Sequence, residues 1–346
     1  MWLILVFSLI FFYTSSGNPV DVTFKNVTFR GYQMFTPKFK PTILLGNNLK
    51  DFLPKLPFDN IEFLDQKIPI IYKEAITDIS QLYELDMDFC EIKEIRPGAF
   101  RNLTNLNRMS FKMNQLRRIE NGVFNKLPVE TVDLSFNQIS YIHTKAFDDM
   151  PELFQINLGT NWLSKWNPDW FTNTPKLSVL YFRNNFIEEL PAKSFKNLKK
   201  ERYVTIDLIF NGNRISSIHR DAFEGLKQIH ILSLSNNLLQ NFDKNLLKNV
   251  VVKYMELNNN SIACFDDLDE VFKATYTYID NNPIKCDCLK KIQTWSEKNH
   301  KDVGVADMNC PEDHHNIIEI EDVQELAKDI YAIQKITLIL PDNEIS

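Results

Sequence analysis

Side chains that could carry out catalysis are few in this 346-residue sequence, and they are not arranged for it. No histidine lies in an HExxH pattern or beside a nucleophile motif; the six are His143, His219, His230, His300, His314 and His315. The run from Glu312 to His315 offers metal-binding atoms, but we interpret it as a solvated loop. Phosphate-binding motifs of the GxxxxGKS/T and GxGxxG types do not occur. We therefore expect no enzymatic activity, no cofactor and no metal site.

The remaining chemically distinctive groups are five cysteines and three glycosylation sequons. Cys286 and Cys288 form a CxC pair, and Cys310 follows. Because no second pair follows at the spacing of zinc ligands, we expect disulfide bonds instead of a metal or redox site. The N-x-S/T sequons begin at Asn26, Asn102 and Asn259. Disulfides and N-linked glycans both indicate an oxidising, extracellular compartment.

The amino terminus reads as a secretory signal peptide. Residues 1–13 are apolar without interruption, and the small residues Ser15, Ser16 and Gly17 follow, so we predict cleavage after a signal peptide of residues 1–17. The alternative is an uncleaved anchor, but the apolar run falls short of the ~20 residues that span a bilayer. No later segment is long enough to do so, and we expect a secreted mature chain without a membrane span.

The composition argues against a nucleic-acid-binding protein and is unusually rich in asparagine. A net charge of −6, without a stripe of Lys and Arg, argues against a nucleic-acid partner. The sequence holds 35 asparagines but 9 glycines, whereas glycine is usually about 7% of a chain. Such a bias indicates a structural use of asparagine.

An internal repeat supplies that use. The pattern LxxLxLxxNxL recurs, and its ninth residue, which we call the ladder position, is spaced by 22–24 residues except once, where 28 residues separate Asn185 from Asn213. The ladder residues are Cys90, Asn114, Asn137, Asn161, Asn185, Asn213, Asn237, Asn260 and Asn282. Stacked Asn amides can satisfy the buried backbone groups of each turn, which would also explain why few glycines are needed. A Phe near position 19 of each repeat is expected to fill the convex side. We interpret the extra residues around Lys199 to Arg202, which account for the 28-residue spacing, as a solvated insertion, with a basic contact loop as the alternative.

Residues 58–285 resemble the extracellular leucine-rich-repeat family in this pattern and pitch. The resemblance implies an α/β solenoid of about nine to ten repeats, shaped as a horseshoe with a parallel sheet on its concave side. Positions 1, 4, 6 and 11 of each repeat should face a continuous core. Cys90 at the ladder position is a known alternative to Asn, and we expect it to be structural.

Residues 286–316 resemble the cysteine-containing C-terminal cap of that family. The sequence shows its NPxxCxC opening at Asn282 to Cys288, its tryptophan at Trp295 and a distal Cys310, but lacks a fourth cysteine beyond it. Cys264 and Cys286 each lie four residues after a ladder residue, so neighbouring turns should bring them together. Two schemes stay open: Cys264–Cys286 with Cys288–Cys310 from this spacing, and Cys264–Cys288 with Cys286–Cys310 from the family pairing.

The amino-terminal segment 18–57 has no cysteine cap. Residues 22–29 alternate like a strand and are expected to seal the open edge by pairing with the first repeat. This segment is similar to the start of the leucine-rich immune proteins of mosquitoes, a resemblance that implies a coiled-coil tail and binding to complement-like thioester proteins. Here the tail, residues 317–346, carries a short 3-and-4 apolar spacing from Val323 to Leu340. We expect a helix that packs on the cap, with a dimerisation helix as the alternative.

The solvent-facing positions of the concave sheet are candidates for partner binding. The first repeats offer an acidic end, the next offer Arg108 and Lys112, and later ones offer aromatic residues. Because Tyr and Arg are favoured interface anchors, our candidate contacts are Tyr181, Arg183, Tyr254, Tyr276, Tyr278, Arg108 and Lys112. We expect a secreted glycoprotein that recognises a protein or pathogen-derived ligand in insect innate immunity; the alternative is an extracellular matrix, adhesion or soluble receptor-like protein.

Overall fold

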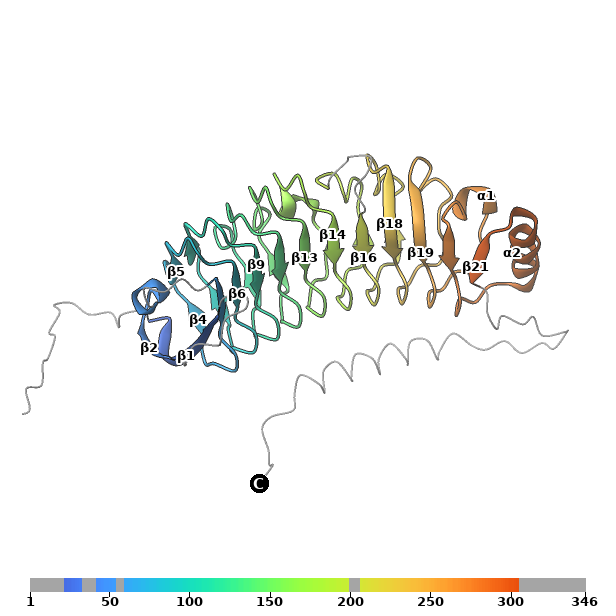
Figure 1. The fold of residues 1–346 in the computed structure, drawn as a ribbon. Coiled ribbons are helices and arrows are strands. Elements are labelled where there is room, and N and C mark those ends of the chain that lie inside the picture. The colour runs from blue at the N-terminus through green and yellow to red at the C-terminus, as the bar shows by residue number, and fades with distance from the viewer. Residues whose placement is uncertain (1–21, 33–41, 54–58, 199–205, 305–346) are drawn as a thin grey trace, which may run out of the picture. The chain divides into compact units, whose positions relative to one another are not determined.

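A computed structural model describes residues 22–32, 42–53, 59–198 and 206–304. All of them belong to one compact unit, Met1–Met308. Within it the chain winds into a parallel β-solenoid of about ten turns, which confirms the predicted fold class (Figure 1). The signal peptide 1–17, the insertion at 199–202, the run Glu312 to His315, Cys310 and the tail 317–346 lie outside the described residues, and the predictions about them stand as predictions.

A thirteen-stranded sheet forms one side of the described solenoid, in the order β2-β1-β3-β6-β9-β11-β13-β14-β16-β18-β19-β20-β21. From β3 onward neighbouring strands run parallel, whereas β1 pairs antiparallel with both β2 and β3. The bounds are β1 (Phe24–Tyr32), β2 (Thr42–Gly46), β3 (Asn60–Glu62), β6 (Glu84–Asp86), β9 (Arg108–Ser110), β11 (Thr131–Asp133), β13 (Gln155–Asn157), β14 (Val179–Tyr181), β16 (Asp207–Ile209), β18 (Gln228–Ser233), β19 (Val251–Glu256), β20 (Tyr276–Tyr278) and β21 (Asp302–Gly304).

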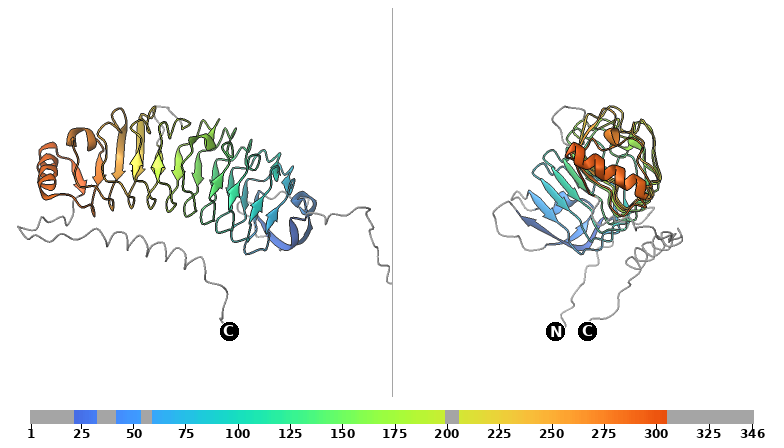
Figure 2. Two further views of the ribbon diagram at one scale, coloured as in Figure 1. Left: turned by 180° about the vertical axis from the view of Figure 1, so that it is seen from behind. Right: turned by 90° about the vertical axis from the view of Figure 1, so that its right-hand side faces the viewer.

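The opposite side consists of turns and short parallel strand pairs, as the two views of Figure 2 show. The pairs join β4 (Ile70–Ile71) to β7 (Glu94–Ile95), β5 (Ile76–Thr77) to β8 (Phe100–Arg101), β10 (Arg118–Ile119) to β12 (Tyr141–Ile142) and β15 (Glu189–Leu190) to β17 (Ser217–Ile218). The described helices are the 3-10 turns η1 (Leu49–Phe52) and η2 (Pro168–Phe171), α1 (Leu268–Val271) and α2 (Cys286–Asn299).

The strands pair in the register that the repeat pattern requires. Leu85 lies opposite Met109, and Met109 opposite Val132, so the fourth position of each repeat neighbours the fourth position of the next. Because successive side chains on a strand point to opposite faces, positions 4 and 6 enter the core and positions 3 and 5 face outward. The core is continuous along the stack, and the Phe residues near position 19 are buried in it as expected. Phe124 and Phe147, for example, stack with ring centroids 5.6 Å apart.

The asparagine ladder joins each turn to the one before it. In every ladder Asn, Nδ2 donates to the sixth-position carbonyl of its own repeat and to that of the preceding repeat, at 2.8–3.2 Å. Oδ1 accepts the N–H of position 11 of the preceding repeat at 2.9–3.0 Å. One amide therefore satisfies three backbone groups that would otherwise be buried without partners.

Cys90 replaces the amide donor with a thiol. Its Sγ donates to the carbonyl of Phe63 in the first repeat at 3.0 Å and to that of Asp88 at 3.2 Å. Burial raises the pKa of the Cys90 thiol to about 12, so the proton that makes these bonds is retained at neutral pH. The expected structural role of this free cysteine is confirmed.

The turn before each ladder residue is left-handed, which corrects our explanation of the glycine count. Position 8 has φ between 54° and 68° in nine successive repeats, at Phe89, Met113, Phe136, Thr160, Asn184, Gly212, Asn236, Asn259 and Asn281. These turns do require a permissive backbone, and Asn supplies it four times because its short side chain tolerates this conformation. A bulky residue there costs about 1 kcal/mol or more.

Strand β1 pairs with the first repeat at the amino-terminal end, as predicted, but the paired residues follow the expected segment 22–29. Arg30 to Tyr32 pair with the first repeat, whereas Phe24 to Phe29 pair with β2. Gln66, which stands at the ladder position of the first repeat, accepts the N–H of Thr28 through Oε1 at 2.8 Å. The ladder thus ends in a contact with the capping strand.

At the carboxyl end, α2 carries Cys288, Leu289 and Ile292 into the core. Cys288 forms a disulfide with Cys264, with the Cα atoms 5.6 Å apart. The Cys264–Cys286 bond expected from spacing is therefore wrong, and the family pairing is right for this bond. The reason is that α2 begins at Cys286: residues two apart lie about 200° apart around a helix, so Cys288 faces the core while Cys286 stays half-exposed. No described helix is long and apolar enough to cross a membrane.

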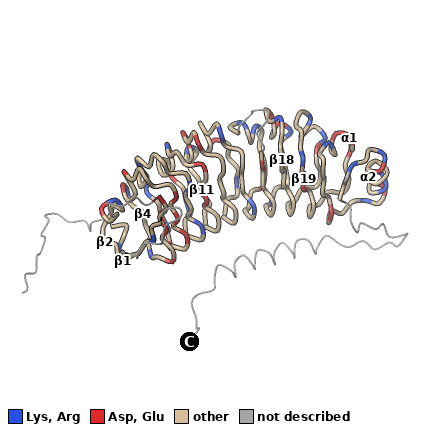
Figure 3. The backbone as a smooth tube through the Cα atoms, in the orientation of Figure 1, with Lys and Arg blue, Asp and Glu red and all other residues tan. Residues whose placement is uncertain are grey.

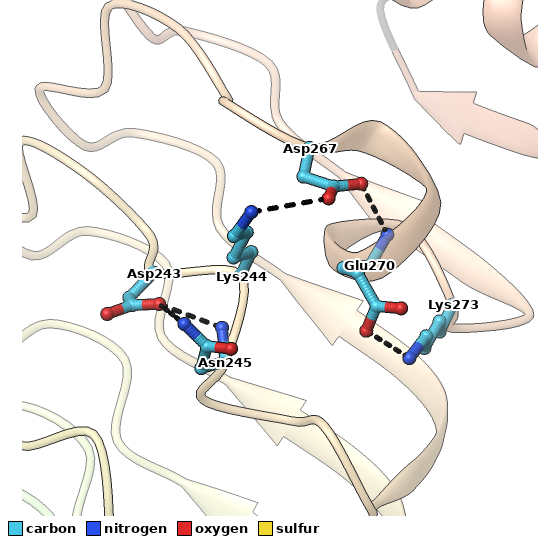
Figure 4. A network of polar contacts seen from close by, with 6 residues as sticks. All are labelled: Asp243, Lys244, Asn245, Asp267, Glu270 and Lys273. Carbon is cyan, nitrogen blue, oxygen red and sulfur yellow. Dashed lines mark hydrogen bonds and ion pairs between the residues drawn. The ribbon is translucent and has the colours of Figure 1, made fainter.

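Removing one ladder amide is expected to destabilise the whole stack. Asn161→Ala deletes the bonds to the carbonyls of Leu134 and Leu158 and to the N–H of Ile139. Since each buried polar group left unsatisfied costs about 1–3 kcal/mol, we expect the free energy of unfolding in urea to fall by about 3 kcal/mol or more. The control is Asn245→Ala: Asn245 is exposed and bonds to Asp243 in its own turn (Figure 4), so a change within about 0.5 kcal/mol is expected. Equal losses in the two variants would contradict the ladder's role.

The Cys90 thiol should resist alkylation in the native protein. It is fully buried, and burial raises its pKa to about 12, so little thiolate is available to react. Peptide mapping after treatment with iodoacetamide at pH 8 should find Cys90 unmodified in the native state and modified after unfolding in guanidinium. Rapid labelling of the native protein would show that this turn opens readily.

Candidate binding face

The outward positions of the long sheet form one extended surface whose residue types change along its length. Positions 3, 5 and 7 of the early repeats carry mostly charged residues, and those of the later repeats carry mostly aromatic, aliphatic and uncharged polar residues. Figure 3 shows acidic residues gathered near β1 and β4. Because the strands stack in register, this division follows directly from the order of the repeats.

The charged half is dominated by carboxylates that lie close enough to repel one another. Burial, followed by the charges of Asp88 and Glu62, raises the pKa of Asp86 to about 6. Burial also raises the pKa of Asp88, and the charge of Asp133 on β11 adds to that shift. Asp88 accepts from the Ser110 hydroxyl and the Lys112 N–H, both at 2.6 Å. Within the described residues, no three His, Cys, Asp or Glu side chains are placed to hold a metal ion.

The two basic candidates lie on and just after β9, beside these carboxylates. Arg108 is exposed on the strand itself, and Lys112 is half-buried in the turn that follows. The Lys112 ammonium lies 5.5 Å from the centre of the Phe136 ring in the next repeat, within the range of a cation–π interaction. These two residues therefore belong to the acidic half and not to the aromatic one.

Three of the predicted tyrosines come together at the other end. The rings of Tyr254 and Tyr276 stack 5.1 Å apart and within 11° of parallel, because both occupy position 3 of adjacent strands. His230 meets Tyr254 edge-on, with ring centroids 5.5 Å apart. Tyr278 is exposed and lines a shallow pocket of about 300 Å³ together with Ser235, Glu256, Asn258 and Asp280.

Tyr181 and Arg183 form a separate group. Strands β16 and β18 lie between β14 and β19, so the strands that carry Tyr181 and Tyr254 are about 14 Å apart at the usual strand spacing. The half-buried Ile209 and Ile231 occupy these intervening strands and make the surface between the groups apolar. Arg183 extends over Gly159 of the preceding repeat, where an added Cβ would lie 3.0 Å from the arginine Cγ.

Several residues of this half were not predicted from the sequence. His230 was overlooked because it precedes the repeat's outward positions; its Nδ1 lies 3.0 Å from Oδ1 of Asp207, which holds the ring beside Tyr254. Ile209, Ile231, Glu256 and Asp280 occupy positions 3, 5 or 7 and could have been found by reading every repeat in the same frame.

The three sequons lie at differing exposures. Asn26 and Asn102 are exposed, and Nδ2 of Asn102 donates to Asp78 at 2.6 Å. Asn259 is half-buried at position 8, in the left-handed turn after β19. Glycosylation of these residues remains a prediction.

Comparisons with known proteins agree with this geometry. Residues 69–202 match the family model described as "BspA type Leucine rich repeat region", in six copies. The chain is 26% identical to osteomodulin of Rattus norvegicus over 76% of its own length and 61% of that protein, and 28% identical to keratocan of Mus musculus over 64% and 62%. It thus spans about three fifths of the length of these curated relatives. The crystal structure of the mouse RP105/MD-1 complex contains a similar fold, with a TM-score of 0.62 and 19% identity over 75% of this chain and 46% of that one. The repeat pattern, the fold and these matches together show a leucine-rich-repeat solenoid.

The acidic half predicts a specific dependence of stability on pH. The pKa of Asp86 is raised from its ordinary 3.8 to about 6, so the folded state disfavours the carboxylate, and this destabilisation grows as the pH rises from 3.8 through 6. Asp86→Asn keeps an oxygen that can accept the Asp88 N–H bond and removes the charge. It should therefore raise the melting temperature at pH 7.5 and have little effect at pH 3.5, as measured by circular dichroism. Glu130→Gln, at an exposed site, is the control; an Asp86→Asn effect of equal size at both pH values would argue against charge repulsion.

Proposed function

We propose that this protein is a secreted binding module that recognises another protein through the aromatic half of its concave sheet. The observation that carries the proposal is the stacked pair Tyr254 and Tyr276, with His230 packed edge-on against Tyr254. Tyrosine provides a large contact area with little conformational entropy to lose, and a prearranged stack loses still less on binding. Tyr278 and the group of Tyr181 and Arg183 would extend the contact.

The shape of the surface favours a macromolecular ligand. The thirteen strands extend over roughly 55–60 Å at the usual spacing, and the pocket beside Tyr278 has a volume of only about 300 Å³. Sites for small molecules enclose most of their ligand, which a shallow pocket on a long sheet does not do. The relatives of the chain, moreover, are binding or structural proteins and not enzymes.

Secretion is supported by two features of different kinds. The apolar residues 1–13 predict a signal peptide, and the Cys264–Cys288 disulfide fits an oxidising compartment. The curated relatives osteomodulin and keratocan are extracellular matrix proteins, which favours a role in matrix or adhesion. The insect immune role implied by the resemblance to mosquito leucine-rich immune proteins is the alternative form of the proposal, and a dimer through residues 317–346 belongs to that form.

A pull-down with matched variants tests the proposal. The tagged full-length protein is incubated with extracellular fluid and with a matrix extract, and retained proteins are quantified by mass spectrometry. A Tyr254→Ala/Tyr276→Ala variant should retain the specific partner about tenfold less than the wild type, because hot-spot tyrosines dominate interfaces. The control is Tyr141→Ala, an exposed tyrosine on β12 of the opposite side.

The outcomes separate the two forms of the proposal. Recovery of matrix or membrane-receptor proteins supports the matrix form, and recovery of complement-like thioester proteins supports the immune form. Equal retention by the double variant and the wild type, with both folded by circular dichroism, would place the binding site elsewhere.

A further inference from the structure

Three exposed apolar side chains form a row at the turns that follow β6, β9 and β11. Phe89, Met113 and Phe136 occupy position 8 of three consecutive repeats, with 47%, 38% and 36% of their surface exposed. We call this row the apolar ridge. The turns are in register, because the N–H of each of the three donates to the position-7 carbonyl of the next repeat, at 3.0–3.1 Å. Neighbouring members of the ridge are therefore about one strand spacing apart.

The fold does not require apolar residues at this position. All three adopt the left-handed conformation, with φ of 54–57°, which bulky residues disfavour. The same position carries Asn184, Gly212, Asn236, Asn259 and Asn281 in later repeats, the residue types that this turn prefers. None of the three side chains belongs to the buried core, since each is exposed. Both unfavourable features recur in three adjacent turns, which points to a role for the exposed groups themselves.

Carboxylates border the ridge on its sheet side. Asp88 immediately precedes Phe89, and Glu62, Glu84 and Asp86 lie on β3 and β6 beside it. After burial, the charges of Asp88 and Glu62 raise the pKa of Asp86, and the charge of Asp133 raises that of Asp88, so a cationic ligand would stabilise the ionised cluster. On the ridge side, Lys112 is turned toward the Phe136 ring.

We propose that the apolar ridge and the carboxylates of Glu62, Glu84, Asp86 and Asp88 form a second docking surface, which binds a basic amphipathic segment of another protein. Apolar side chains of the segment would lie on Phe89, Met113 and Phe136, and its Lys or Arg residues would face the carboxylates. The chain's own tail does not fit this description, because residues 317–346 contain seven Asp and Glu against two Lys. This surface is separate from the tyrosine group at β19 and β20, so it stands or falls independently of the proposed function.

Substitution by asparagine gives an unusually clean test of the ridge. The variant Phe89→Asn/Met113→Asn/Phe136→Asn installs the residue that four other repeats use at the same turn, and it creates no N-x-S/T sequon. Its unfolding midpoint in urea should equal or exceed that of the wild type. Any loss of binding is then due to the missing side chains and not to misfolding. The matched control is Leu238→Asn, which removes an apolar side chain of 42% exposure from a distant repeat.

The probe is a fluorescein-labelled synthetic peptide of about fifteen residues with Lys on one helical face and Leu on the other. Two further peptides serve as comparisons: one replaces Leu with Ser and the other replaces Lys with Glu. Fluorescence anisotropy should show that the full-length protein binds the Lys–Leu peptide at least tenfold more tightly than either comparison. The ridge variant should lose about tenfold in affinity, and Leu238→Asn should lose none.

A second variant tests the electrostatic half. Asp86→Asn/Asp88→Asn retains oxygens that can accept the existing hydrogen bonds, so the fold should be kept. The variant should bind the Lys–Leu peptide severalfold more weakly than the wild type, and its affinity should depend less on salt. The Tyr254→Ala/Tyr276→Ala variant should bind the peptide as the wild type does. The proposal is overturned if the wild type does not bind the Lys–Leu peptide, if the ridge variant binds it as tightly as the wild type, or if the Lys–Ser peptide binds equally well.

Discussion

A buried asparagine amide in each turn satisfies backbone groups of two successive repeats, and the rest of the solenoid depends on this interaction. The strands of each repeat are too short to form a domain alone, and the chain must leave them through a turn that is enclosed by its neighbours. Asn137, for example, bonds to the carbonyl of Phe111 in the repeat before it and to that of Leu134 in its own. An apolar residue here would leave both carbonyls without partners in the interior. The amide thus sets the position of each repeat relative to the last.

This arrangement leaves the outward positions free to vary. Since the ladder and the core use positions 4, 6, 9 and 11, the side chains at positions 3, 5 and 7 can change from charged to aromatic along the sheet without altering the fold. The register places Tyr254 directly beside Tyr276, just as it places Met255 beside Thr277 in the core. The carboxylates of Asp86 and Asp88 are tolerated for the same reason, although burial raises the pKa of both, with a further contribution from the charge of Asp88 at Asp86 and from that of Asp133 at Asp88. Stability is supplied by one set of positions, and another set remains available for recognition.

Features of this structure that depend on a repeat position could be predicted from the sequence, and features that depend on local contacts could not. The ladder, the Phe column and the outward candidates were predictable because each depends on a periodic position, and a long series of equivalent positions outweighs local propensity. The disulfide was not, because periodicity ends where α2 begins: Cys286 matches Cys264 in repeat position, but the helix turns Cys288 toward the core instead. His230 was missed for a similar reason, since its place beside Tyr254 depends on the Asp207 contact and not on the pattern. The left-handed turn could not be deduced from a pattern letter that allows any residue, as Phe89 and Asn281 occupy it equally.

Because of that left-handed turn, position 8 favours different residues from the outward positions on the strands. At positions 3 and 5 an apolar side chain rests on a flat sheet and suits the strand, so Ile209 or Ile231 has a structural explanation in β-propensity alone. At position 8 the backbone favours Asn or Gly, and the side chain projects beyond the end of the strand. A bulky apolar residue there is opposed by the backbone conformation and by exposure to water, and the ladder gains nothing from it. The Phe89–Met113–Phe136 row is therefore harder to attribute to folding than any tyrosine on the sheet, and its position beside the carboxylates of β6 and the turn after it gives it a definite ligand chemistry.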